Sequence, residues 1–509
     1  MSEWGSGYVT DTAYVHDFCR VQTPAILSFA ALAKSVAAPG LDGEPLTYCD
    51  LGCGQGFTAN LVAAANPAAE VFAADFNPTH IAGARALAAA AGLSNIAFRE
   101  ADFEELLDDS SLPSFDIICL HGVYSWISER HRQTIVAFIR RRLNPGGLVY
   151  ISYDAMPGWA GIAPLRRVLV QHAASSGALS EIASDHALAF ADKLKELDAH
   201  FYRMYPHVSA QMDRLKKLPR SYLAHELLTR NWQAFSFVDV AAELADAKLT
   251  YLASAHLIDH VDRVNFTESQ QSFLAKITDP LLGETTRDMI IGRQFRRDIF
   301  VKGVMRLPSL PARERWLRTR FVLSVPADEV QMTFDTALGT LQLRPDIYKP
   351  VIEVLNEGPM TLRELMERPA VSRLEWVSLT DAIKVLVGRG DLHPALPADN
   401  QAKREAMTTA FNNAVLARAK ESTELGYLAS PVTGGGIRVD RLTQLYLLAK
   451  VQDGANPTDL MAKTAMMSGH SIEKDGKKLE PEEMAAALAA HATQIEKHMV
   501  PLLNRLGIG

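Results

Sequence analysis

The stretch DLGCGQG, residues 50–56, places an acidic residue and three glycines between an apolar segment and a helix-like one. Gly52, Gly54 and Gly56 allow the backbone to approach a ligand closely and to adopt positive φ angles, and the helix behind them begins with free N–H groups. A dinucleotide fingerprint reads GxGxxG and holds a pyrophosphate. Here the spacing is GxGxG, and Asp50 would repel a pyrophosphate and attract an ammonium group.

Two further acidic residues end the second and third expected strands. Asp75 lies 19 residues after Gly56, a distance that suits a carboxylate binding ribose hydroxyls, and Phe76 after it could cover an adenine face. Asp102, followed by Phe103, could accept a hydrogen bond from the adenine amino group. An adenosine with an amino-acid tail and no phosphate satisfies this set, and S-adenosylmethionine is such a ligand.

These residues must be positioned by strands that end at one edge of a sheet. The expected strands are 46–51, 70–75, 95–102, 115–120 and 148–153, with helices between them. Short apolar strands alternating with helices predict a parallel sheet covered on both faces. Open α/β sheets bind ligands at the carboxyl ends of such strands. The sequence therefore predicts an α/β fold with a Rossmann-like sheet.

Four motifs in order carry a family resemblance. DLGCGQG, AAD at 73–75, EADF at 100–103 and NPGGLVYIS resemble class I S-adenosylmethionine-dependent methyltransferases. LHGVYSWIS, SYDAMPGWAG and SYLAHELL further resemble the bacterial methyltransferases with a methyltransferase regulatory domain, among them rickettsial protein-lysine methyltransferases that act on outer-membrane protein. The match is strong over about 45–160 and weaker over about 215–300. Asp154 departs from the asparagine expected there, so the resemblance says least about the acceptor.

The resemblance implies an enzyme of class 2.1.1 that uses S-adenosylmethionine and releases S-adenosylhomocysteine. Methyl transfer from a sulfonium is an in-line displacement that requires alignment rather than a metal, so no metal site is expected. The predicted cofactor-binding residues are Asp50, Gly52, Cys53, Gly54, Gly56, Asp75, Phe76, Asp102, Phe103 and His121.

HGVYSW, residues 121–126, follows the fourth strand, where class I methyltransferases place the residues that flank the transferred methyl. The Asn/Asp-Pro-Pro-Tyr sequence of amino-directed DNA and glutamine methyltransferases is absent, which argues against those substrates. Tyr124 and Trp126 are candidates for an aromatic wall beside the sulfonium and the incoming amine; packing in the core is the alternative. His121 is expected to contact the cofactor rather than to act as a base.

A lysine acceptor must lose its proton before it can attack, since its ordinary pKa is about 10.4. Desolvation and the sulfonium charge both favour the neutral amine, and Tyr124 and Tyr153 are candidates to orient it. Tyr222, His225 and Glu226 share one face of an expected helix in SYLAHELL. His225 is the catalytic candidate there, and a hydrogen-bonding site between helices is the alternative.

Three functions remain open from the sequence. The expected one is a protein-lysine N-methyltransferase, and the alternative is an O- or N-methyltransferase acting on a small molecule or cell-surface component. The third is a protein- or DNA-binding regulator with a vestigial methyltransferase core. Acids outnumber bases from Arg344 to Asp391, and the would-be recognition helix SLTDAIKVLVG carries only Lys384 as a base. A DNA reader needs a cationic face, so nucleic acid is not an expected partner.

Changes in the expected pattern of helices and strands divide the chain into four parts. We expect a methyltransferase core with an N-terminal helical segment at 1–161, a mostly helical middle domain of regulatory type at 162–306, a winged-helix-like segment at 307–400 and a helical C-terminus at 401–509. The glycine-rich PVTGGG, 431–436, looks mobile. A strand at 249–255 either returns to the first sheet or belongs to a separate domain.

The composition favours a cytoplasmic soluble protein. The net charge of −7 gives no general attraction to nucleic acid. The cysteines have neither CxxC nor zinc spacing, so we expect reduced, buried thiols. No N-terminal apolar region marks a signal peptide, and no apolar run approaches the ~20 residues that span a bilayer. The expected partner is a protein substrate, and the sequence leaves a homodimer open.

Overall fold

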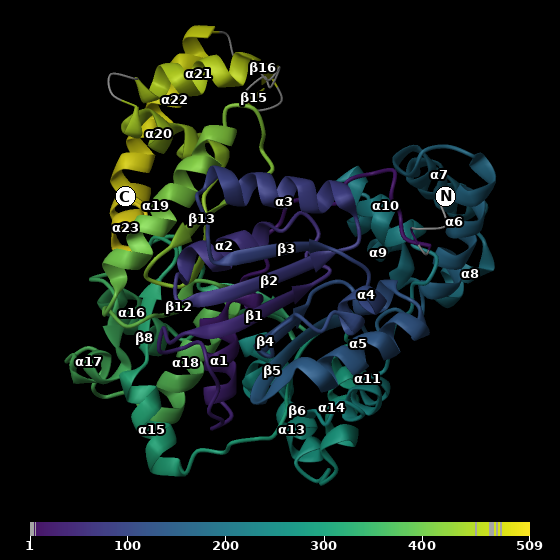
Figure 1. The fold of residues 1–509 in the computed structure, drawn as a ribbon, viewed down its shortest axis with the longest axis horizontal. Helices are drawn as coiled ribbons and strands as arrows, with labels where there is room; N and C mark the ends of the chain where they lie inside the picture. The colour runs from purple at the N-terminus through teal and green to yellow at the C-terminus, as the bar shows by residue number, and fades with distance from the viewer. Residues whose placement is uncertain (1–4, 6, 453–455, 468–472, 475–476, 479–480) are drawn as a thin grey trace.

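The computed structural model describes residues 5, 7–452, 456–467, 473–474, 477–478 and 481–509. A seven-stranded sheet in the order β3-β2-β1-β4-β5-β7-β6 forms its centre (Figure 1). The strands are β1 (Leu46–Leu51), β2 (Ala69–Asp75), β3 (Ile96–Glu100), β4 (Phe115–Leu120), β5 (Leu143–Asp154), β6 (Thr250–Ser254) and β7 (Phe295–Val301). The first five are parallel, and β7 runs antiparallel to β5 and β6. The predicted Rossmann-like sheet is confirmed.

The central strands are buried on both faces, because consecutive apolar side chains point to opposite sides of the sheet. In β1, Tyr48 packs with one set of helices and its neighbour Cys49 with another. The first set is α1 (Pro24–Leu32), α2 (Phe57–Ala65) and α3 (Pro78–Ala90); the second is α4 (Phe103–Asp108), α5 (Glu129–Arg142) and α11 (Phe237–Ala245). All four cysteines are free.

The expected strand at 249–255 joins the first sheet as β6. The connection from β6 to β7 contains η4 (Leu257–His260), α12 (Asp262–Asn265), α13 (Glu268–Leu274) and α14 (Pro280–Ile291). Sequence reasoning missed β7 because three of its seven residues are charged. Two of them, Arg296 and Asp298, are buried and paired at 2.7 Å, and Arg296 also pairs with buried Asp288. Such pairing is what lets charges enter a core strand.

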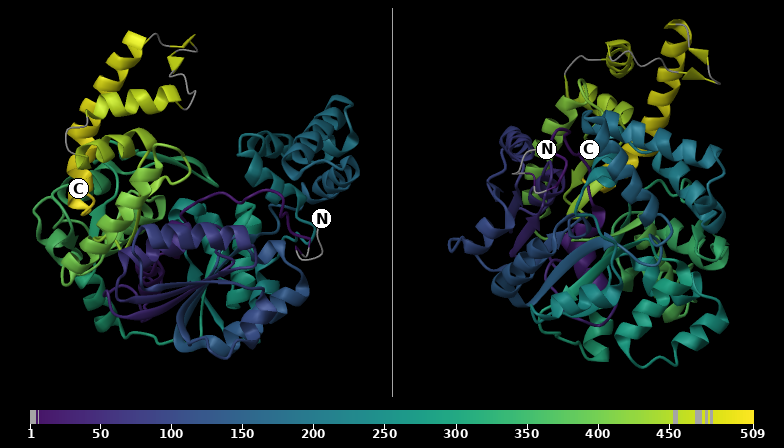
Figure 2. Two further views of the ribbon diagram at one scale, coloured as in Figure 1. Left: turned by 45° about the horizontal axis from the view of Figure 1, so that its top comes forward. Right: turned by 90° about the vertical axis from the view of Figure 1, so that its right-hand side faces the viewer.

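The middle segment is therefore split between the sheet and a separate helical layer. That layer comprises α6 (Ala163–Ser176), α7 (Ser180–Glu196), α8 (His200–Met204), α9 (His207–Leu215) and α10 (Arg220–Leu228). These helices bury their own apolar cluster, which also includes Val9 from the N-terminal segment. Figure 2 shows this layer and the C-terminal helices projecting from opposite ends of the sheet.

The next part of the chain, the expected winged-helix-like segment at 307–400, contains helices and short strands. Its elements are α15 (Ser309–Arg318), β8 (Arg320–Leu323), β9 (Thr333–Thr336), β10 (Gly339–Gln342), α16 (Pro345–Leu355), β11 (Met360–Thr361), α17 (Leu362–Glu367), α18 (Trp376–Arg389) and β12 (Leu392–Ala395). β8, β11 and β12 form a three-stranded sheet. A Cβ added to Gly388 of α18 would lie 2.7 Å from Ile258 of η4, so α18 packs closely against the core.

The C-terminal part contains α19 (Gln401–Arg418), β13 (Tyr427–Ser430), β14 (Gly435–Arg438), α20 (Arg441–Val451), α21 (Pro457–Met467), β15 (Glu473–Lys474), β16 (Lys477–Lys478), α22 (Pro481–Gln494), the π-helix η5 (Ile495–Met499) and α23 (Val500–Arg505). The mobility predicted for 431–436 is wrong, because this turn between β13 and β14 is buried. Gly434 accepts a hydrogen bond from Asn66 on its carbonyl oxygen at 2.8 Å. A Cβ on Gly436 would lie 2.7 Å from Leu61. The glycines here permit close packing.

Candidate active site

A cavity of about 510 Å³ lies where β1, β2, β4 and β5 end. The predicted residues that line it are Asp50, Gly52, Cys53, Gly54, Asp75, Phe76, Phe103, His121, Trp126 and Tyr153. The predicted residues that do not line it are Gly56, Asp102, Tyr124 and His225. The sheet thus brings together most of the residues that the motifs singled out.

The glycine loop is shaped by its neighbours. Gly52, Gly54 and Gly56 all have positive φ, at +72°, +53° and +64°. A Cβ on Gly52 would lie 2.5 Å from Val123, so a larger residue would block the loop beside the cavity. Gly56 lies away from the cavity, where a Cβ would meet Ala84 at 2.5 Å. Its lack of a side chain serves the packing of α2 against α3 rather than ligand contact.

Asp75 is held rigidly at the cavity wall. One carboxylate oxygen accepts the N–H of Gly54 at 2.9 Å, and the other accepts the N–H of Asn77 at 2.9 Å. The second oxygen also lies 3.1 Å from Nδ1 of buried His80, whose Nε2 is 3.3 Å from the N–H of Tyr14. An Nε2 that accepts from Tyr14 leaves Nδ1 as the donor to Asp75. His80 therefore connects this carboxylate to the N-terminal segment.

Asp50 is 3% exposed, and its hydrogen-bond donor is Nε2 of Gln22, 3.2 Å away. Burial raises the pKa of the Asp50 carboxyl to about 7. No Lys or Arg pairs with it in the part of the chain that the structure describes. A cationic group of a ligand would fit beside it.

Asp102 caps α4 rather than lining the cavity. It accepts the N–H of Glu105 at 2.8 Å, and the side chain of Glu105 accepts the N–H of Asp102 at 2.9 Å, which forms a capping box. One carboxylate oxygen is thereby committed to the helix. Adenine contact by Asp102 stays a prediction, whereas Phe103 next to it does line the cavity.

The ring of His121 is fixed by two hydroxyls. Its Nδ1 lies 2.9 Å from the Tyr150 hydroxyl and 3.0 Å from Oγ of Ser152. Burial and then the nearby charge of Arg297 lower the pKa of His121 to about 3. A neutral imidazole with so low a pKa is a poor general base near pH 7, which agrees with the predicted contact role.

The structure does not place Tyr124 at the cavity, so its role in the reaction stays a prediction. η3 (Tyr124–Trp126) turns its ring into the core, where it is fully buried against Phe235. Its hydroxyl donates to the carboxylate of Glu243, which also pairs with Arg132 at 3.2 Å. Trp126, two residues on, lines the cavity and contacts the ring of Tyr14.

Replacing Tyr124 with phenylalanine should therefore affect stability more than activity. The change removes one buried hydrogen bond to a carboxylate, so we expect the free energy of unfolding to fall by about 1–3 kcal/mol. Urea unfolding measures this fall, and kcat should stay within about twofold of the original. A kcat loss of tenfold or more would show that Tyr124 acts in the reaction.

Two other catalytic candidates need correction. Tyr153 lines the cavity, but its hydroxyl donates to Asp298 at 2.7 Å and is not free to orient an amine. His225 is fully buried, and its ring packs against Tyr8 and Tyr14 at centroid distances of 5.1 and 5.2 Å. Burial lowers the pKa of His225 to about 4. His225 does not line the cavity, so its catalytic role stays a prediction that this geometry does not support.

Sequence reasoning did not assign two buried carboxyls at the far side of the cavity. Asp154, at the end of β5, and Glu226, on α10, are each 5% exposed. Asp154 accepts from Nε1 of Trp232 at 2.6 Å, and Glu226 accepts from the hydroxyl of Tyr222 at 3.3 Å. Burial raises the pKa of both carboxyls, and the charge of Glu226 raises that of Asp154 further. The spacing of Tyr222 and Glu226, which places them on one face of a helix, was the sequence signal that could have indicated Glu226.

Aromatic residues line the cavity that contains this acidic pair. Among the aromatic residues that line the same cavity are Tyr8, Tyr14, Phe76, Trp126, Trp159 and Tyr222. Tyr8 and Tyr14 come from the N-terminal segment, which closes one wall of the cavity. Residues so far apart in the chain form no periodic pattern from which such contacts could be predicted.

Family comparisons agree with this geometry. Residues 43–187 match the model of a methyltransferase domain, and residues 219–302 match that of a predicted methyltransferase regulatory domain. The uncharacterized protein sll1526 of Synechocystis sp. is 39% identical over 508 residues, which cover 99% of both chains. The chain belongs to the methyltransferases with a methyltransferase regulatory domain. It is an S-adenosylmethionine-dependent enzyme of class 2.1.1.

Relatives of this methyltransferase include solved structures. PKMT2 from Rickettsia typhi in complex with AdoHcy shares its fold with a TM-score of 0.67 at 18% identity, over 97% of this chain and 99% of that one. The uncharacterized protein RP789 of Rickettsia prowazekii is 28% identical over 279 residues, or 54% of this chain and 49% of that protein. The common fold covers the sheet and both extensions.

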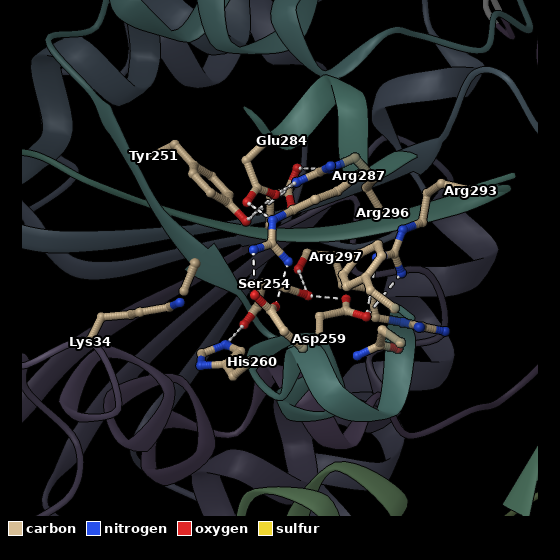
Figure 3. A pocket seen from close by; sticks show the side chains of 15 residues that line it. Lys34, Tyr251, Ser254, Asp259, His260, Glu284, Arg287, Arg293, Arg296 and Arg297 are labelled. Carbon is tan, nitrogen blue, oxygen red and sulfur yellow. Dashed lines mark hydrogen bonds and ion pairs between the residues drawn. The ribbon is translucent and has the colours of Figure 1, made fainter. Parts of the chain in front are cut away.

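A second cavity of about 160 Å³ lies beside β6 and β7 of the methyltransferase (Figure 3). Its arginines Arg287, Arg293 and Arg296 each pair with a carboxylate. Because the charges neutralise one another, this cluster is an ion-pair network that joins the strands to α14. Within the described ranges, no group of His, Cys, Asp and Glu could hold a metal ion, and no helix could cross a membrane.

Proposed function

We propose that this methyltransferase transfers a methyl group to the ε-amino group of a protein lysine. The observation that carries the proposal is the buried pair Asp154 and Glu226, which lies among aromatic rings in the same cavity as the cofactor-loop residues. Aromatic faces and carboxylates together favour a cationic side chain. The resemblance of SYLAHELL to rickettsial protein-lysine methyltransferases supports the same acceptor.

The acidic pair can also remove the proton that blocks attack. Its two carboxyls are close enough for the charge of Glu226 to raise the pKa of Asp154. Burial favours the protonated form of both carboxyls and the charge of nearby Arg166 opposes it, so the pair can hold one proton and one negative charge. A lysine ammonium that enters beside the ionised carboxyl can transfer its proton there and become the neutral nucleophile. Trp126 and Tyr222 would orient the amine.

Residues at the other end of the cavity fit S-adenosylmethionine. Asp75 would bind the ribose hydroxyls, Phe76 would cover the adenine, and the buried carboxyl of Asp50 would bind the ammonium group. When bound, the cofactor supplies an activated methyl group on a positively charged sulfur. His121, kept neutral, adds no charge that would repel that sulfur.

The binding of S-adenosylmethionine should become weaker as the pH falls. An ammonium group prefers the ionised form of Asp50, whose pKa is about 7, so below that pH binding must displace a proton. We expect the Kd to rise by up to about tenfold per pH unit between pH 7 and pH 5. Calorimetry at several pH values tests this, and Asp50→Asn should have a flat profile. An equally steep profile in Asp50→Asn would contradict the assignment.

The DNA-binding alternative loses its main support. α18 is the helix that would read DNA, and Leu379, Ile383 and Leu386 on it are buried. Its Lys384 pairs with Asp381 at 2.6 Å. A helix covered in this way has no cationic face for phosphate contacts.

Incubation with methyl-tritiated S-adenosylmethionine and a heat-treated bacterial lysate tests the lysine proposal. Label should enter protein, and acid hydrolysis should release it as methyllysine. Gly52→Val is the control without activity, because its side chain would meet Val123. Label recovered only in solvent-extractable material, or in protein residues other than lysine, would overturn the proposal in favour of another acceptor.

A further inference from the structure

β7 contributes one positive charge to the cofactor cavity. Arg297 is the only lysine or arginine among the described residues that line it, and it faces an acidic lining. The acidic lining residues are Asp17, Asp50, Asp75, Asp154 and Glu226. A lone guanidinium in such surroundings would be expected to pair with one of these carboxylates.

Arg297 nevertheless forms no ion pair within the described residues, and its guanidinium stacks over the ring of Phe295 at 5.0 Å. The other arginines of the adjoining second cavity behave differently. Arg287 pairs with Asp262 at 2.6 Å, and Arg293 pairs with Asp259 at 3.1 Å. Arg297 lines both cavities. Its donors are thus available to an anion that enters the cofactor cavity.

The sheet order places this arginine at one end of a line of ligand-binding groups. Along the edge, Asp75 ends β2, Asp50 lies in β1, His121 follows β4, and Arg297 lies in β7 beyond β5. β7 is antiparallel, and Arg297 pairs in register with Ser152 near the end of β5. The charge of Arg297 reaches His121, since it contributes to lowering the pKa of that ring.

We propose that Arg297 binds the carboxylate of the methionine part of S-adenosylmethionine. The amino-acid end of the cofactor carries an ammonium and a carboxylate. Asp50 offers a negative charge to the first, and Arg297 is the one positive charge of the described lining that can meet the second. A guanidinium binds a carboxylate through two parallel hydrogen bonds, so Arg297 recognises the amino-acid tail as well as holding it.

Two ligands that differ by one group test this role. S-adenosylhomocysteine has the carboxylate, and S-adenosyl-3-thiopropylamine lacks it but keeps the amine and the adenosine. The original protein should bind the first at least tenfold more tightly. In Arg297→Gln, calorimetry should show the Kd of S-adenosylhomocysteine raised at least tenfold and that of the thiopropylamine within twofold of the original. Arg297→Lys should recover part of the loss.

Arg287→Gln is the matched control, because Arg287 lines only the second cavity. It should change neither Kd. Equal weakening of both ligands by Arg297→Gln would assign Arg297 a structural role and overturn the proposal, as would no change in either. Should Arg297→Gln fail to fold, the original protein and Arg297→Lys decide together. Equal affinity of the original protein for the two ligands overturns the proposal, and a preference for S-adenosylhomocysteine that Arg297→Lys reduces supports it.

Discussion

Replacing Asp75 with alanine is expected to raise the Kd for S-adenosylmethionine by about 100-fold or more. Hydrogen bonds to a charged group contribute about 1.5–3 kcal/mol each, and the Asp75 oxygen that accepts the Gly54 N–H can accept one more from a ribose hydroxyl. The loss also removes the acceptor of the Gly54 N–H and of His80. Isothermal calorimetry measures the Kd, and kcat at saturating cofactor should fall far less.

Glu100→Gln is the matched control for this change. Glu100 pairs in register with Asp75 on the neighbouring strand, but it is exposed and does not line the cavity. The Kd of the Glu100→Gln variant for S-adenosylmethionine should stay within twofold of the original. Asp75→Asn, which keeps the volume, guards against misfolding and should still weaken binding at least tenfold. Binding of the original strength in a folded Asp75→Asn protein would contradict the ribose assignment.

The second large effect should come from the acidic pair. We expect the double variant Asp154→Asn, Glu226→Gln to lower kcat by about 100-fold or more, because a positioned proton acceptor typically contributes 10²–10⁴-fold. The Kd for S-adenosylmethionine should change little. In the original protein, kcat/KM should rise with pH as the pair ionises, since the ionised form accepts the lysine proton. In the double variant, kcat/KM should rise only with deprotonation of the lysine itself, whose ordinary pKa is about 10.4.

Glu181→Gln controls for the loss of a glutamate from the same helical layer. Glu181 belongs to α7 and does not line the cavity, so its variant should keep the original pH profile. Stopped-flow or discontinuous assays with a peptide that contains lysine supply both parameters. If the double variant kept its kcat and its pH dependence, the pair would have no part in proton removal.

Sequence reasoning predicted the cofactor side better than the acceptor side. The glycine loop and Asp75 follow strands directly, and a parallel sheet brings the ends of its strands to one edge. Tyr124 and Trp126 lie in a short 3₁₀ turn, where the direction of a side chain does not follow from a period of two. One ring faces the core and the other the cavity, and sequence spacing does not distinguish them.

The missed features share a long-range origin. The strand Phe295–Val301 looks too polar for a core, and the pairing of Arg296 with Asp298 and with Asp288 on α14 makes this arginine acceptable there. Tyr8 and Tyr14 reach the cavity because the N-terminal segment is held by contacts with residues that lie far along the chain. Glycines 434–436 resemble a flexible turn until the residues packed on them are known.

The buried turn at 431–436 has a consequence for how the protein unfolds. It rests on Asn66 and Leu61 of the Rossmann-like half, while Arg20 of that half donates to the carbonyl oxygen of Val387 at the end of α18. Cutting the chain near residue 306 would expose apolar surface on both fragments. Heat or urea should therefore melt these parts together, in a single cooperative event, and neither fragment should survive as a stable protein alone.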